Sequence, residues 1–510
     1  MKTQTGRIAI NSLSLYINMI MTMAVTLLGT RFVLKALGDD QYAVYILIAN
    51  IVSLFSFINV AMASASQRYM SFFMGTGKQE CVNEVFYNSV AIHTTIAILV
   101  ATILLAAGIP AIKLWLTIPA TLHNDAIIVL LCMAAGIVFM ITSVPYEAAM
   151  NAHEDIHAIA AINILEAFCK LAAAVTILFL KNCGLPLYAL LIMCSSIIAF
   201  ACKKRFSRRR YAETHFTWHR IHDKKLLKQM TSYAGWNLIG NGCSIARYQG
   251  AAIVLNSFFG LLYNAGYGIS QQVNGFLMFF ANSAVRPMRP YIIKNEGAGN
   301  HHLITKYSLS TSRITTLLLA AVVIPLYINM PFILEIWLDK APDGSLEFCR
   351  GFLVITLIGQ FTIGQQIALE SAGRIRNQHI ILGSMHILPI IVSTIMFACD
   401  DAPDRYRYII YCIIVEEIMC LVIRSIIAKK DAGMPIMPFV TEHLVPISTT
   451  LGVTLLATYY ISDNLIEPVT KLIISTLCST VSIGILAFTI CLRKWEKEKI
   501  YSLLHFKRSV

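Results

Sequence analysis

The 510-residue chain is 57% hydrophobic and only 14% charged, and its formal net charge is +13. Its mean hydropathy is +0.66. Because a soluble domain carries about 25% charged residues, this composition excludes a soluble globular protein. Apolar stretches long enough to cross a bilayer recur along the whole chain, and lipid forces the backbone to pair internally. The sequence therefore predicts an all-α polytopic membrane protein.

The apolar stretches predict about fourteen transmembrane helices. Their expected ranges, in chain order, are 8–34, 42–66, 86–108, 125–148, 156–180, 184–202, 229–258, 262–285, 307–330, 347–370, 378–398, 406–428, 444–462 and 469–492. The first is too long for a signal-peptide core, so we expect it to be retained. Most of the 41 Lys and Arg residues fall on one side when the spans alternate. The positive-inside rule then places both termini in the cytoplasm.

Residues recur at a nearly constant spacing along the chain. Gly38, Ala43 and Tyr45 reappear 222 residues later as Gly260, Ala265 and Tyr267. The order of the predicted spans repeats with the same period, so the fold is expected to contain two pseudo-symmetric six-helix bundles. The corresponding parts are an N-terminal lobe at 1–228, a second lobe at 229–430, and two further helices with a basic tail at 431–510. Parallel repeats of this kind are typical of transporters that work by alternating access.

Two features of the N-terminal lobe carry chemistry near the expected membrane boundaries. Arg31 lies near the outer end of the first span, where its side chain either snorkels to water or binds an anion. His153-Glu154-Asp155-Ile156-His157 matches H-E-x-x-H, the zinc-protease pattern, in which two histidines on one helix bind zinc and the glutamate acts as base. The motif lies at a turn between two spans, with no third ligand apparent. We therefore rank a metalloprotease as a remote alternative and expect no metal.

Charges also occur inside the lobe. Glu166 and Lys170 lie four residues apart in the fifth span, so they can pair on one helix face. Two readings are open: a relay for a coupling ion, or a neutralised structural pair. A basic cytoplasmic loop is expected at 203–228, beginning KKRFSRRR. It anchors the topology and meets anionic lipid, and its attachment to membrane on both sides argues against nucleic acid.

The seventh and eighth spans carry the most polar faces of the chain. Asn237 and Asn241 share one face of the seventh span, and Gln271 and Asn274 share one stripe of the eighth. Such amides either pair between helices or line a wet cavity that binds substrate. Arg247 lies on the flank of the first face. A charge within the membrane costs at least ~2.5–3.5 kcal/mol, so either an anionic ligand or an acid on another helix should neutralise it.

The second lobe also contains Glu416 within the twelfth span, beside a second glutamate. A titratable residue at that depth is a candidate for coupling transport to an ion. The thirteen cysteines are scattered and form no C-x-x-C pair, so we interpret them as small apolar residues. The sequence predicts no cofactor and no enzymatic activity.

The hairpin R-x-V-L-x-x-L-G-x-x-x-Y-x-x-Y, from Arg31 to Tyr45, resembles the N-terminal signature of bacterial polysaccharide flippases. These belong to the multidrug/oligosaccharidyl-lipid/polysaccharide exporter superfamily. The resemblance covers essentially the whole chain and implies a MATE-like fold in the bacterial inner membrane. It implies transfer of a polyprenyl-pyrophosphate-linked oligosaccharide to the outer leaflet for O-antigen or capsule synthesis. H⁺, Na⁺, membrane lipids and the polysaccharide assembly machinery are its implied partners, and Arg247 and Arg31 its implied phosphate contacts.

Two competing functions remain open beside the remote metalloprotease. A cation-coupled multidrug exporter of the same superfamily would share the fold but would favour an acid-lined cavity. A membrane glycan polymerase or ligase would normally need a large outer loop for catalysis. The predicted outer loops are short, which argues against that class.

Overall fold

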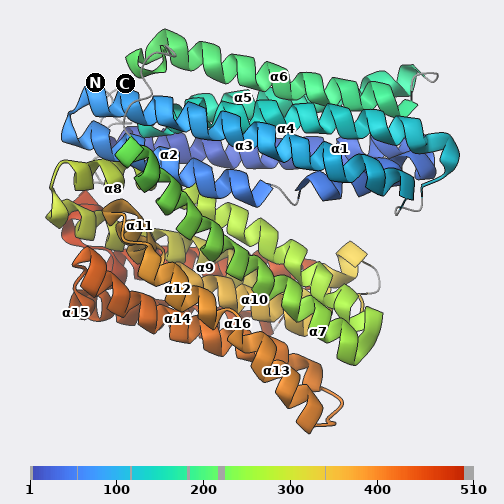
Figure 1. Cartoon of the computed structure of the whole chain (residues 1–510). Helices are drawn as coiled ribbons and strands as arrows, with labels where there is room; N and C mark the ends of the chain where they lie inside the picture. The colour runs from blue at the N-terminus through green and yellow to red at the C-terminus, as the bar shows by residue number, and fades with distance from the viewer. Residues whose placement is uncertain are drawn as a thin grey trace, which may run out of the picture. The chain divides into compact units, whose positions relative to one another are not determined.

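The computed structural model describes residues 4–53, 56–114, 118–180, 184–215, 224–338, 341–463 and 465–498, and within these ranges the chain forms helices and no strand (Figure 1). The chain divides into two compact units. One comprises Ala9–Leu238, and the other comprises Ile239–Val510 with Met1–Ile8. The second unit therefore contains both the residues of the predicted second lobe from 239 onward and the two predicted additional helices.

The N-terminal unit is a bundle in which α4 is the central helix. α4 packs against α2, α3 and α6, and its residues Val129, Leu130 and Ala149 are fully buried. The helices of this unit are α1 (Gln4–Ser53), α2 (Ser56–Thr76), α3 (Gln79–Leu114), α4 (His123–Ala152), α5 (Ile156–Phe179) and α6 (Gly184–Arg210), with short turns η1 (Ala120–Leu122) and η2 (Ala212–Thr214).

In the C-terminal unit, α9 has the most central position. It packs against α10, α11 and α17. The helices here are α7 (Lys224–Val285) from residue 239 onward, α8 (Met288–Gly297), α9 (His301–Leu338), α10 (Ser345–Gln360), α11 (Ile363–Ala372), α12 (Arg376–Met385), α13 (Leu388–Cys399), η4 (Arg405–Arg407), α14 (Tyr408–Ala432), α15 (Ile436–Phe439), η5 (Val440–Leu444), α16 (Val445–Asp463), α17 (Pro468–Leu486) and η6 (Ala487–Cys491).

A single glycine reverses the chain at the matched position of each repeat. Gly38 interrupts α1 with φ 70° and ψ 176°, and Gly260 interrupts α7 with φ 75° and ψ −167°. This backbone region is essentially restricted to glycine. In the second repeat the two arms of α7 contact each other, because the Tyr267 hydroxyl donates to the Tyr248 carbonyl at 3.3 Å. The matched glycines are therefore the residues that fold each long helix into a hairpin.

The repeat predicted from the sequence is present in the backbone. α3 and α9 begin 222 residues apart, at 79 and 301, and α4 and α10 begin 222 residues apart, at 123 and 345. Gly77 and Gly299, which precede α3 and α9, keep the same spacing and the same positive φ. The two units thus use one helix plan, which confirms the predicted fold class.

Eight described helices are long and apolar enough to cross a membrane, and a bent pair, α10 with α11, makes a ninth. Most of the other predicted spans correspond to the two arms of α1, the two arms of α7, and α14. α14 is not among the eight, because Glu416, Glu417 and Arg424 lie within it. The predicted span 42–66 crosses residues 54–55, which lie outside the described ranges.

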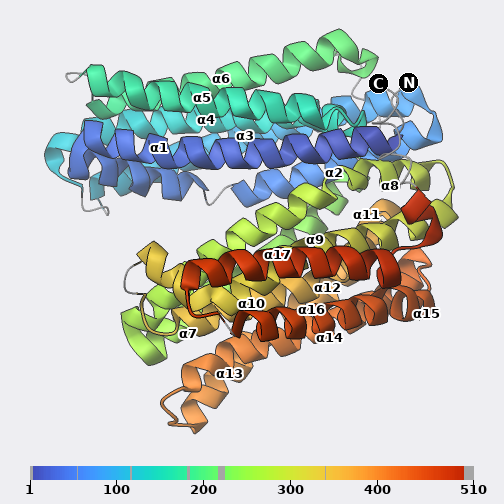
Figure 2. The same ribbon diagram turned by 180° about the vertical axis from the view of Figure 1, so that it is seen from behind.

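The two additional helices cover one side of α9. Half of the residues in the apolar stretch of α9 are buried. In the corresponding stretch of α3, its counterpart in the first repeat, 22% of the residues are buried. α17 packs along α9 and α16 packs against both (Figure 2). Asn329 of α9 donates to the Ser475 hydroxyl of α17 at 2.7 Å, and Arg313 of α9 pairs with Glu496 at 2.5 Å, with both side chains 3% exposed. The segment after α17 therefore neutralises a charge buried in the second repeat.

The basic stretch expected to begin a loop is instead helical. Lys203–Arg210 forms the last two turns of α6, so the loop prediction is wrong for these residues. Lys203 pairs with Glu147 of α4 at 2.8 Å, and three arginines in the final turn suit the negative end of the helix dipole. Residues 216–223 of the same predicted loop lie outside the described ranges.

The matched glycines give a test of the hairpin. Gly260→Ala should destabilise the protein by about 1–3 kcal/mol, because alanine is strained in that backbone region. Gly268→Ala is the control: its φ is helical and an added Cβ would meet nothing within 4 Å. Thermal unfolding of the detergent-solubilised protein should show a lower midpoint for the first variant alone. Equal midpoints would contradict the assignment of Gly260 as the required turn residue.

Candidate functional site

A buried cluster of charged side chains lies inside the C-terminal unit. Nη1 of Arg247, on the first arm of α7, lies 2.6 Å from Oε2 of Glu416 and 3.0 Å from Oε2 of Glu417, both on α14. Nη2 of Arg247 donates to the Tyr248 hydroxyl at 2.8 Å. The arginine side chain is 6% exposed and the glutamates 3% and 10%. The guanidinium is thus enclosed by acceptors from its own unit.

The second oxygen of Glu416 has two further partners. Nδ1 of His386 lies 2.8 Å from Glu416 Oε1, and the Cys420 thiol donates to the same oxygen at 2.9 Å. His386 occupies the short break between α12 and α13. Glu416 and Cys420 stand one turn apart on α14, on the same helix face.

Small residues let the helices around this cluster approach closely. A Cβ on Gly240 of α7 would lie 1.9 Å from the His379 ring of α12, and one on Gly250 would lie 2.5 Å from Ile390 of α13. A Cβ on Gly359 would lie 3.1 Å from a Glu417 carboxylate oxygen. The glycines of α7 therefore allow its first arm to pack against the α12–α13 pair, beside the charges on α14.

The geometry decides between the two alternatives left open for Arg247. The sequence predicts that an anionic ligand or an acid on another helix neutralises Arg247. The structure supplies two acids from α14. An arginine and an acidic pair inside apolar helices are signals that the sequence displays. His386 and Cys420 have no such signal, since nothing in a single sequence relates the α12–α13 break to a face of α14.

The predicted amide residues lie mostly inside the helix bundles. Asn237 is 7% exposed and its Nδ2 donates to the Tyr233 carbonyl of its own helix at 3.3 Å. Asn274 is 6% exposed and its Oδ1 accepts from the Thr356 hydroxyl of α10 at 2.8 Å. Asn241 is half-buried. The buried Nε2 of Gln271 lies near the Tyr267 hydroxyl but makes no hydrogen bond of good geometry within the described protein, so it is the predicted amide best placed to bind something else.

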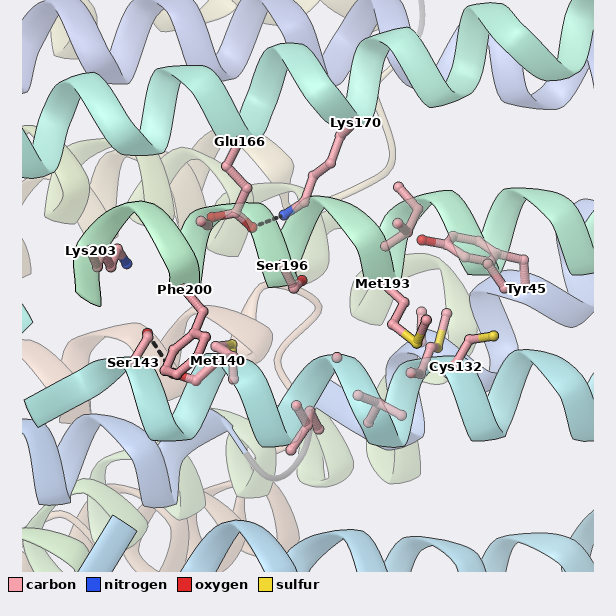
Figure 3. A pocket seen from close by; sticks show the side chains of 18 residues that line it. Tyr45, Cys132, Met140, Ser143, Glu166, Lys170, Met193, Ser196, Phe200 and Lys203 are labelled. Carbon is pink, nitrogen blue, oxygen red and sulfur yellow. Dashed lines mark hydrogen bonds and ion pairs between the residues drawn. The ribbon is translucent and has the colours of Figure 1, made fainter. Parts of the chain in front are cut away.

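Glu166 and Lys170 pair at 2.7 Å on one side of a cavity in the N-terminal unit. The cavity holds about 300 Å³. Both side chains extend from α5 toward α6, and Met140 and Ser143 of α4 lie on the opposite wall (Figure 3). The lining is chiefly apolar, with α1 contributing Tyr45. The two charges therefore neutralise each other at the edge of an apolar cavity. This arrangement agrees with a structural ion pair, and the predicted role as an ion relay is not tested.

The side chain of Arg31 lies outside the described residues, although its backbone belongs to α1. Its predicted role as a phosphate contact stays a prediction.

The H-E-x-x-H pattern does not lie on one helix. α4 ends at Ala152 and α5 begins at Ile156, and Glu154 between them has φ 64°. His153 Nε2 donates to Glu213 Oε1 at 2.6 Å, and its ring stacks on Tyr211 at 4.0 Å, whereas His157 is exposed. The two imidazoles therefore lack the one-face arrangement that zinc proteases require.

The His153 contact affects the acid that it meets. Burial has the largest single effect on the pKa of Glu213 and acts to raise it, but the hydrogen bonds from His153, the backbone and Gln79 and the nearby His153 ring together outweigh burial, so the pKa is lowered below its usual value. A lowered folded-state pKa stabilises the fold above the unfolded pKa, and this stabilisation is lost as the pH falls through the folded value. The motif thus has a structural role at the α4–α5 turn.

One family model and several solved structures are similar to this chain. The MatE family model matches residues 14–176. No curated protein matches the sequence. A MATE crystal structure in the bent conformation superposes with a TM-score of 0.75 at 11% identity, over 84% of this chain and 96% of that one.

Two further solved structures have the same identity and the same two coverages. An outward-facing multidrug resistance MATE family transporter of the MOP superfamily has a TM-score of 0.70. A MOP superfamily transporter from Pyrococcus furiosus Vc1 (DSM3638), described as having a binding pocket of reverse polarity that suggests a different function, has a TM-score of 0.71. The chain therefore has a MATE-like fold.

The two histidines of the motif provide a matched pair of variants. His153→Ala should destabilise the protein by about 1.5–3 kcal/mol, the range for a hydrogen bond to a charged group, and should weaken the fall of stability at acidic pH. His157→Ala should leave both unchanged, because that side chain is exposed. Unfolding midpoints measured across the acidic range test both. Equal losses in the two variants, restored by added zinc, would contradict the structural role.

Proposed function

We propose that the protein is a transporter that flips a polyprenyl-pyrophosphate-linked oligosaccharide across the bacterial inner membrane by alternating access, with both termini in the cytoplasm. The MATE-like fold and the duplicated helix plan support transport. The sequence hairpin around Arg31–Tyr45 supports the glycolipid substrate, which surface polysaccharide synthesis would use. Membrane lipids and the polysaccharide assembly machinery are the expected partners.

The pairing of acids inside the units is the observation that favours a glycolipid over a cationic drug. Glu166 pairs with Lys170, Glu147 with Lys203, and Glu370 with Arg289. Glu416 and Glu417 share Arg247. Each of these carboxylates already meets a base, and of the pairs named here the Glu416–Glu417 pair alone keeps one negative charge in excess, so little charge is left to attract a cationic drug. Amides and hydroxyls, which suit sugar hydroxyl groups, remain for recognition.

Within this proposal the predicted site residues divide into two roles. Gln271 and Asn241 contact the sugar, since the buried Nε2 of the first makes no hydrogen bond of good geometry within the described protein and the second is half-buried on the same long helix. Asn274 joins α7 to α10 through Thr356, and Asn237 bonds to a carbonyl of its own helix. Arg31 remains the proposed contact for the pyrophosphate.

The charge cluster suits coupling to a cation. Arg247 and an incoming H⁺ or Na⁺ would compete for the carboxylates of Glu416 and Glu417, so cation binding would loosen α7 from α14. Arg247 then acts in coupling, and phosphate binding is left to Arg31. Glu166 with Lys170 is a second coupling candidate, in the other unit.

Transport into proteoliposomes tests this function. Purified protein should flip an undecaprenyl-pyrophosphate oligosaccharide and should leave a cationic dye untransported, with and without a pH or sodium gradient. Gln271→Ala should slow flipping about twofold to twelvefold, the effect of losing a hydrogen bond of about 0.5–1.5 kcal/mol. Asn282→Ala, at an exposed amide three turns farther along the same arm, is the control.

Extrusion of the dye without flipping of the lipid would contradict the proposal and favour a multidrug exporter. Equal flipping by the Gln271 and Asn282 variants would remove Gln271 from the substrate site.

A further inference from the structure

Three different metal-ligand atoms converge inside the C-terminal unit. Nδ1 of His386, a carboxylate oxygen of Glu416 and Sγ of Cys420 all lie within 4.8 Å of one another. The Glu416 and Cys420 residues are 3% and 0% exposed, and the His386 side chain is 12% exposed. A nitrogen, an oxygen and a sulfur donor aimed at one point is a donor set typical of zinc sites.

The local structure holds these donors in place. Glu416 and Cys420 lie on one face of α14, and the break between α12 and α13 brings His386 to that face. Arg247 binds the other oxygen of Glu416 at 2.6 Å. A partner that fixes the orientation of a ligating carboxylate is a regular feature of metal centres.

Two of the three separations between donors are close to those around a bound ion, and the third lies within 4.8 Å. Glu416 Oε1 lies 2.8 Å from His386 Nδ1 and 2.9 Å from Cys420 Sγ. Tetrahedral bonds of ~2.0–2.3 Å place donor atoms roughly 3.4 Å apart. An opening of about half an ångström, which side-chain rotation supplies, would admit the ion, with the fourth position left to water.

Charge balance favours a divalent ion. Arg247, Glu416 and Glu417 together carry one excess negative charge when all three are ionised and His386 is neutral. Binding of M²⁺ with transfer of the Cys420 thiol proton to solvent forms a metal–sulfur bond and releases one H⁺. The added charges are then +2 from the ion and −1 from the thiolate, so the filled cluster is neutral within its low-dielectric surroundings.

We propose that His386, Glu416 and Cys420 form a binding site for a thiophilic divalent metal ion such as Zn²⁺, and that the filled site locks the α12–α13 break to α14 and inhibits transport. The inhibition rests on the proposed transport function, whereas metal binding does not. A bound ion would occupy Glu416 and prevent its exchange of partners with a coupling cation.

Cobalt(II) is the probe for binding, because a cobalt–thiolate bond gives a charge-transfer absorption band. Titration of the full-length, detergent-solubilised protein with Co²⁺ should produce this band, and Zn²⁺ should remove it by displacement. Cys420→Ser should abolish the band and His386→Ala should weaken binding by at least tenfold. Cys412→Ser, a thiol two turns away on the same helix, is the matched control and should retain the band.

Absence of the band in the unaltered protein, or its persistence in Cys420→Ser, would overturn the site and leave a hydrogen-bonded network only. The inhibitory part has its own readout: Zn²⁺ should block flipping in the unaltered protein and not in Cys420→Ser. Equal sensitivity of the two would overturn inhibition through this site. A cobalt band in a protein that flips no glycolipid would refute the proposed function while supporting the metal site.

Discussion

The energetic cost of a charge in lipid is the constraint on which the rest of this structure depends. An isolated charge at the centre of a bilayer costs several kcal/mol. The ion pairs described above each join two residues of the same unit, so each charge meets an opposite charge within its own unit. Arg247 meets two glutamates, Arg313 meets Glu496, and Lys170 meets Glu166. Each pair also links two segments of the chain or two turns of one helix. The same contacts therefore neutralise the charges and hold the helices together.

The duplicated plan and the charge pairs have complementary roles. Gly38 and Gly260 fold matched helices into hairpins, so both units begin with the same geometry. The second unit then departs from the first, because α16, α17 and the segment around Glu496 cover α9. It also contains the Arg247 cluster on α7 and α14. The two units therefore share a helix plan but differ in the charges buried within it.

Much of the fold was predictable from sequence because apolar length and a fixed repeat spacing are properties of the chain itself. The hairpin glycines, the helix order and the pairing of Glu166 with Lys170 follow from spacing along the sequence. The partners of Arg247 were predictable only as a class, since the distance from residue 247 to residue 416 is set by tertiary packing. His386, Cys420 and Glu496 could not be assigned, because their roles arise from a helix break, a helix face and a terminal segment that meet only in the folded protein. The basic stretch at 203–210 was misassigned to a loop because charge was taken to end the helix, although a helix can continue past the membrane surface.

A double-mutant cycle between Arg247 and Glu417 tests most directly whether the buried charges are compensated within the unit. Arg247→Gln, Glu417→Gln and the double variant would be compared by the free energy of unfolding in detergent. The account predicts that the single changes are strongly non-additive, with a coupling energy of roughly 1–3 kcal/mol, since the double variant removes both members of a pair. Additive losses, with no coupling energy, would show that Arg247 and Glu417 do not compensate each other and would contradict the account.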